Sequence, residues 1–268
     1  MISEFSRLNA RLMSINAEIN KGIRNKYFYI GFVALLFSLV LNTMTEWGLD
    51  PNTQDVLYYY QVAHVQPLSL VSLSLSGLGG FLYLKEKENG FDKYCVIREG
   101  RKNYSRNTTL VSVLVGPMAV LAAETAFIAL LRTIMPVCLL TNPVHENRIV
   151  SESFGYLLKS GHYYLFLLTH LFFRFMSSLF ISSVSFTVAV VLNNTYTSIS
   201  GCFIIYFLLC QISASRKIPK MINAYAVING CVISGHPVAS MIYTAVFTIF
   251  AVLICGTICI GMIKRGYK

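Results

Sequence analysis

Long apolar runs separated by short polar segments form the main pattern along this chain. A helix needs about 20 apolar residues to cross the roughly 30 Å hydrocarbon core of a bilayer. Six runs approach or exceed that length: Tyr27–Met44, Pro67–Leu84, Leu110–Leu131, Tyr163–Leu192, Thr197–Ile212 and Val238–Ile263. None alternates with a period of two, which excludes the strands of a transmembrane barrel. The pattern predicts an all-α integral membrane protein with a six-span transmembrane domain over residues 27–268.

The N-terminal segment, residues 1–26, has a different periodicity. Its apolar residues recur at steps of three and four, which places them on one stripe of a helix: Ile2, Phe5, Leu8, Leu12, Ile15, Ile19 and Ile23. The segment is too polar for a signal peptide. We predict an amphipathic helix that lies on the inner membrane surface and leads into the first span. A helix packed on a partner subunit, or a short coiled coil, is the alternative.

Residues 213–237 fit neither a loop nor a span. Basic residues and Pro219 open the segment, and the apolar run Met221–Ile233 that follows is interrupted by Asn223, Asn229 and Gly230. A run of this length is too short to cross a bilayer. We therefore expect a re-entrant segment that dips into the outer leaflet just before the last span.

Composition supports the membrane assignment and gives an orientation. Of 268 residues, 55% are hydrophobic and only 13% are charged, about half the charge of a typical soluble domain. Soluble enzymes, nucleic-acid-binding proteins and disordered chains are thereby excluded. The net charge is +10, and most Lys and Arg residues lie before the first span, between the second and third, and after the last. Because cytoplasmic loops collect these residues, both termini are predicted to be cytoplasmic.

No catalytic or metal-binding motif emerges from the sequence. There is no Walker A sequence for binding ATP, and His145-Glu146 lacks the second histidine of a zinc helix. The glycine-rich stretch from Leu75 to Gly80 lies inside an apolar run, where glycines allow helices to pack closely. The seven cysteines are read as small apolar residues. We expect no enzyme activity and no cofactor or metal bound by this chain.

Three ionisable residues lie inside the predicted spans, where such groups are costly and seldom face lipid. They are Glu124 in the third span and His170 and Arg174 in the fourth. A rise of about 1.5 Å per residue places all three in the outer half of the membrane. Glu124 is predicted to pair with His170 or Arg174. The cluster is either a structural link between the helices or a polar element of a translocation path.

The cytoplasmic loop 85–106, between the second and third spans, carries the most informative polar sequence. It mixes both charge signs, and its spacing places Phe91, Tyr94, Cys95, Ile97 and Arg98 along one side of a short helix. An exposed helix with such anchors is suited to docking in a groove of another protein. An ordinary solvated loop is the alternative.

These features together resemble the permease subunits of type-2 ABC exporters (the ABC-2 type), in particular small bacterial members. Glu86, Gly90, Arg98 and Arg101-Lys102-Asn103-Tyr104 are similar to a loop motif of those members, E-x-x-x-G…R-x-x-R/K-x-x-Y. The architectural resemblance covers nearly the whole chain, while the motif is confined to this loop. The segment from Arg132 to His162 departs from the family, because the turn between the third and fourth spans is usually tight.

The resemblance implies a permease in a bacterial plasma membrane that works with a second permease copy and separate cytoplasmic ABC ATPase chains, which bind the ATP. The loop would couple to the ATPase through Glu86, Gly90, Phe91, Tyr94 and Arg98. The substrate would be a peptide or an amphipathic antimicrobial or lipid-like molecule, moved outward by alternating access. A secondary transporter and a non-transporting membrane assembly factor are the alternatives.

Overall fold

The described part of the chain is almost entirely helical. The computed structural model describes residues 16–17, 19–44, 55–65, 75–139, 154–214, 227 and 237–266, and none of these is in a strand. The elements are α2 (Lys26–Met44), α3 (Val56–Val65), the 3₁₀ turn η2 (Leu75–Gly77), α5 (Leu78–Glu88), α6 (Phe91–Glu99), α7 (Arg101–Ile134), α9 (Gly155–Lys159), α10 (Tyr163–Leu192), α11 (Thr197–Ala214) and α13 (Pro237–Arg265).

Four of these helices, α2, α7, α10 and α13, are long and apolar enough to cross a membrane. The described residues are thus all-α, with four helices of the length and composition that membrane spans have, in agreement with the predicted fold class. The fourth predicted span coincides with α10 from end to end, whereas α7 begins at Arg101, well before the apolar run at Leu110. The apolar part of α11 is shorter than a span. The second predicted span is described only from Leu75 onward, so the count of six spans stays a prediction.

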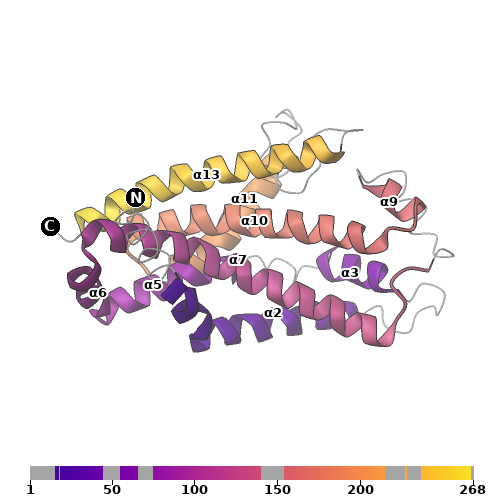
Figure 1. The fold of residues 1–268 in the computed structure, drawn as a ribbon, viewed down its shortest axis with the longest axis horizontal. Coiled ribbons are helices and arrows are strands. Elements are labelled where there is room, and N and C mark those ends of the chain that lie inside the picture. The colour runs from indigo at the N-terminus through magenta and orange to yellow at the C-terminus, as the bar shows by residue number, and fades with distance from the viewer. Residues whose placement is uncertain are drawn as a thin grey trace, which may run out of the picture.

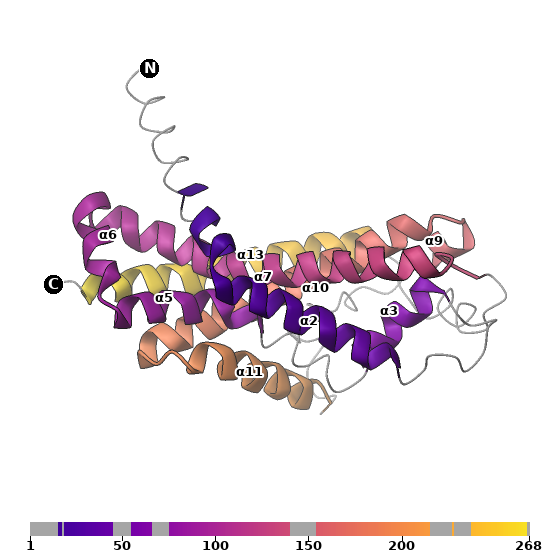
Figure 2. The same cartoon turned by 90° about the horizontal axis from the view of Figure 1, so that it is seen from below.

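The long helices run side by side along the long axis, with α10 between α7 and α13 (Figure 1). Helix α2 packs on α7, and α11 covers another side of α10 (Figure 2). At one end lie α6, the end of α13 and the turn between α10 and α11. At the other end lie α3 and α9 (Figure 1). Helices α2 and α7 run toward the end that holds α3 and α9, whereas α10 and α13 run back toward the end that holds α6 (Figure 1).

A seam of small residues holds η2 and α5 against α7. A Cβ atom on Gly79 would overlap the backbone carbonyl of Ser112, and one on Gly116 would overlap the carbonyl of Ser76. The interpretation of the glycine stretch as a packing device is confirmed. Helix α7 also continues through Pro117 without interruption, so it is not the broken helix expected of many secondary transporters.

Serine hydroxyls join the helices in the same region. Ser76 Oγ and Ser178 Oγ lie 2.7 Å apart, Ser182 donates to the Val113 carbonyl at 2.9 Å, and Ser198 donates to the Gly77 carbonyl at 2.6 Å. In a membrane the hydrophobic effect does not drive helices together, because lipid is as apolar as their side chains. Close packing of small residues and interhelical hydrogen bonds of this kind hold them together instead. These serines have a structural role.

Two predicted segments lie mostly outside the described residues. For the re-entrant segment 213–237, little beyond the isolated helical residue Val227 is described. Of the N-terminal helix, residues 1–15 and 18 lie outside, and residues 19–24 are helical. Ile19 and Ile23 pack against a cluster formed by α2, α5 and α7 that includes Phe28, Leu82 and Val115. This end of the apolar stripe therefore contacts the bundle of the same chain.

Candidate functional site

Helix α6 is set off from its neighbours by two glycines. Gly90 has φ 71° and Gly100 has φ 78°, in the left-handed region that residues with a Cβ seldom adopt. The first glycine ends the turn after α5, and the second reverses the chain into α7. Gly90 and Gly100 have nothing within 4 Å of the place where a Cβ would lie, so backbone conformation is the reason for glycine at both positions.

The outward side of α6 is an apolar ridge formed by Phe91, Tyr94 and Ile97. Tyr94 is 73% exposed and Ile97 82% exposed, and the spacing of three residues places all three on one face. Cys95 does not share this face. It is buried in a cluster with Tyr83 and Tyr104, so its predicted place among the exposed anchors is wrong.

Around the ridge the basic side chains are exposed, whereas the acidic ones are paired or buried. Three carboxylates have partners: Glu86 pairs with Lys21 at 2.8 Å, Glu99 pairs with Arg98 at 2.8 Å, and Glu88 accepts a hydrogen bond from the Thr195 hydroxyl. The fourth, Asp92, is buried. The exposed charged residues of α6 and the start of α7 are mostly basic: Lys93, Arg98, Arg101, Lys102 and Arg106. The mixed-sign loop of the sequence is therefore an apolar ridge with a basic rim. We call Phe91, Tyr94, Ile97, Lys93, Arg98, Arg101 and Lys102 the α6 surface.

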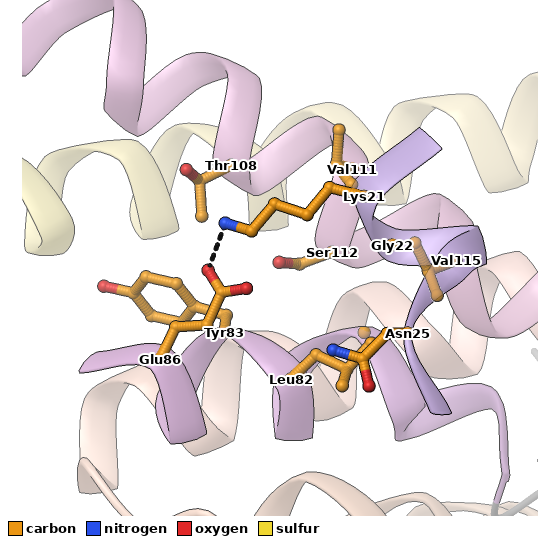
Figure 3. Close-up of a pocket in the computed structure, with 11 residues that line it drawn as sticks. Lys21, Gly22, Asn25, Leu82, Tyr83, Glu86, Thr108, Val111, Ser112 and Val115 are labelled. Carbon is orange, nitrogen blue, oxygen red and sulfur yellow. Dashed lines mark hydrogen bonds and ion pairs between the residues drawn. The ribbon is translucent and has the colours of Figure 1, made fainter. Parts of the chain in front are cut away.

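Lys21 links the N-terminal helix to the turn before α6. Its Nζ contacts Glu86 Oε2 beside a cavity of about 30 Å³ that Gly79, Thr108 and Ser112 help to line (Figure 3). The same Nζ lies 4.6 Å from the centre of the Phe91 ring, within the range of a cation–π interaction. A cavity of this size holds about one water, so it is packing space and not a substrate site.

The turn between α10 and α11 is tied to the end of α5. Lys87 Nζ donates to Asn193 Oδ1 at 2.7 Å, and the Thr195 hydroxyl donates to Glu88 Oε1. The N-terminal helix and this turn therefore both contact the end of α5, which leads into α6.

A second polar site lies buried at the opposite end of the bundle. Glu124 of α7 accepts a hydrogen bond from the Tyr60 hydroxyl at 2.8 Å, and His64 Nε2 lies 3.1 Å from Glu124 Oε1. The Glu124 side chain is 2% exposed and that of His64 is 6% exposed. We call Tyr60, His64, Glu124, Arg174 and His170 the polar cluster.

The predicted partners of Glu124 are present in the cluster but do not make its direct contacts. Arg174 interacts electrostatically with Tyr60, His64 and Glu124. The His170 ring centre lies 6.3 Å from that of Tyr60 and 4.6 Å from that of Phe166. The prediction that Glu124 pairs with His170 or Arg174 is wrong about the ion pair, which forms with His64.

Sequence reasoning missed Tyr60 and His64 because α3 is too short to register as a span. The sequence did contain one sign of a helix at this place, the N-cap residue Asp55. Its Oδ1 accepts a hydrogen bond from the Tyr58 amide at 2.7 Å, a typical helix N-cap. Its Oδ2 accepts another from the Leu139 amide at 2.9 Å, which ties the start of α3 to the segment that follows α7.

Within the part of the chain that the structure describes, no three His, Cys, Asp or Glu side chains gather as a metal site. Of the cysteines found there, Cys95, Cys202 and Cys259 are buried.

Comparison with known proteins gives no match: no described protein family, no curated protein and no solved structure is similar to this chain.

Proposed function

We propose that this chain is the membrane permease subunit of an ATP-driven exporter, and that the α6 surface is its docking site for a cytoplasmic ATPase. The observation that carries the proposal is the apolar ridge of Phe91, Tyr94 and Ile97, exposed at one end of a membrane bundle. Aromatic and Arg side chains are the usual anchors of protein interfaces. The basic rim suits a groove edged by carboxylates.

The distribution of charge supports a cytoplasmic position for the α6 end. Basic residues of the described chain cluster there, before α2, around α6 and at the end of α13, whereas Arg132 and Lys159 lie near the other end. By the positive-inside rule, the α6 end then faces the cytoplasm and both termini are cytoplasmic. The proposed location is the plasma membrane of a bacterium.

The proposed mechanism is alternating access driven by the ATPase. Closure of two ATPase chains on ATP would push α6 of each permease copy. Because α6 connects α5 to α7 through glycine turns and contacts the N-terminal helix through Lys21, its motion passes to several helices together. Rocking of two permease copies would then open a path outward for a peptide or an amphipathic, lipid-like substrate.

The polar cluster has a structural role in this proposal. The side chains of Tyr60, His64 and Glu124 are buried against one another, and through Tyr60 and His64 they join α3 to α7. Asn42 of α2 adds a hydrogen bond to the Ala63 carbonyl at 2.9 Å. These contacts tie α2, α3 and α7 together at the end of the bundle opposite α6.

Purification tests the proposal. The chain is tagged in its native host and extracted in mild detergent, and the proteins that accompany it are identified by mass spectrometry. We expect a P-loop ATPase whose turnover changes when this subunit is added back in lipid. Recovery of the folded chain with no P-loop ATPase, both before and after chemical cross-linking in intact membranes, contradicts the proposal.

A further inference from the structure

Both ring nitrogens of His64 face hydrogen-bond acceptors. Nδ1 lies 2.6 Å from the backbone carbonyl oxygen of Tyr60, one helical turn earlier, and Nε2 lies 3.1 Å from Glu124 Oε1. The other carboxylate oxygen of Glu124 is occupied by the Tyr60 hydroxyl, which donates to it at 2.8 Å. The imidazole therefore stands between two oxygens that have no proton of their own if Glu124 is ionised.

A count of donors gives the number of protons in this arrangement. A neutral imidazole carries one N–H, and its other nitrogen carries a lone pair. With a neutral His64 and an ionised Glu124, one contact would place a lone pair against an oxygen. An unmade hydrogen bond in a buried site costs free energy that water cannot restore. Both contacts are satisfied only when the pair holds one additional proton, carried by His64 Nε2 or by Glu124 Oε1.

We propose that His64 and Glu124 form a proton-binding site that fastens α3 to α7. The proton comes from water and returns to water, and no other bond is made or broken. While it is bound, Nδ1–H donates to the Tyr60 carbonyl and the proton lies between Nε2 and Oε1. When it leaves, one of these two contacts loses its donor: the Nε2 contact that joins α3 to Glu124 of α7, or the Nδ1 contact with Tyr60 that lies within α3. Either loss leaves α3 less firmly held, through its link to α7 or through its own last turn.

Charged and titratable groups face the pair from α3 and α10. Tyr60 lies on α3 and donates to Glu124 in both states, while α10 contributes Arg174 and His170, and α2 contributes the neutral Asn42. The positive charge of Arg174 opposes a second full positive charge on His64 and favours sharing of the proton with the carboxylate. Because the fastened form is the protonated one, low pH secures α3 and rising pH releases it.

This site is independent of the proposed ATPase partner. It concerns the end of the bundle opposite α6, and the test needs only the purified chain. Failure of one proposal therefore leaves the other standing.

Hydrogen exchange of the full chain in lipid nanodiscs, followed by mass spectrometry across a pH series, tests the site. The quantity compared is the protection of residues 56–65, corrected for the intrinsic exchange rate at each pH. One linked proton changes an opening equilibrium by up to about tenfold per pH unit. We expect protection of α3 to fall with rising pH by a factor approaching this limit, while peptides from Ser177–Leu192 in α10 stay unchanged.

His64→Gln is the decisive variant, because an amide keeps a donor and an acceptor at every pH. We expect its α3 protection to be independent of pH. His162→Gln is the matched control, since His162 is an exposed histidine at the same end, and it should retain the pH dependence of the wild type. If His64→Gln does not fold, Glu124→Gln serves in the same comparison. Protection that is flat in the wild type, or that falls equally in the Gln variant, overturns the proposal.

Discussion

Gly79→Ala changes one hydrogen for a methyl group at the seam between α5 and α7. The new Cβ would overlap the backbone carbonyl of Ser112, and a backbone atom cannot rotate away as a side chain can. The helices must separate, which loosens the neighbouring contact between Gly116 and Ser76 as well. Overpacking of this kind costs about 1–3 kcal/mol, which exceeds the roughly 1 kcal/mol that Ala gains over Gly in a helix.

Gly261→Ala is the matched control, because it is the same substitution in a helix with nothing within 4 Å of the new methyl group. Only the gain in helix propensity remains there, so Gly261→Ala should raise the thermal midpoint slightly while Gly79→Ala lowers it. The assay is thermal unfolding in detergent, followed by the loss of the monodisperse peak in size-exclusion chromatography. A Gly79→Ala variant that is stabilised as much as Gly261→Ala would refute the close-packed seam.

Two other predictions concern topology and the polar cluster. In a background without reactive native cysteines, Lys159→Cys should be labelled by an impermeant thiol reagent on intact cells, and Asn103→Cys only after the membrane is opened; the reverse labelling would invert the orientation. In the cluster, Glu124→Gln should lower the thermal midpoint, since breaking a buried pair costs about 3–5 kcal/mol in soluble proteins. His64→Gln should then lower the stability less on the Glu124→Gln background than alone, by about 0.5–3 kcal/mol for contacting residues. Strictly additive losses of stability would show that the two side chains do not interact.

Hydropathy predicted the long helices well because a membrane span is recognised from a continuous run of apolar residues, which can be read directly from the sequence. Helix α10 matches its apolar run at both ends. The polar start of α7 was missed because a hydropathy run begins only where charges end, while the helix itself continues back to Gly100. The glycine stretch was interpreted correctly, since close packing is the simplest use of glycine inside an apolar run.

The polar cluster was only half predictable. Glu124 and Arg174 stand out because charge is rare inside spans. Their partner His64 lies in a short helix between two apolar runs, 60 residues from Glu124, and no local pattern brings it there. The outward side of α6 was predicted from spacing for Phe91 and Tyr94, but the inward turn of Cys95 depends on where α6 rests on α7, which only tertiary structure fixes.

Binding of the co-purifying ATPase to a variant carrying Phe91→Ala and Tyr94→Ala tests the central claim most directly. Truncation of two exposed anchors should leave expression and insertion unchanged and weaken ATPase binding by well over tenfold, since each interface anchor contributes about 2 kcal/mol or more. The control carries Tyr156→Ala and Tyr164→Ala, which remove two exposed aromatics from the opposite end of the bundle, and it should bind as the wild type does. Undiminished ATPase binding by the α6 variant would contradict the assignment of this surface, and with it the case for an ATP-driven permease.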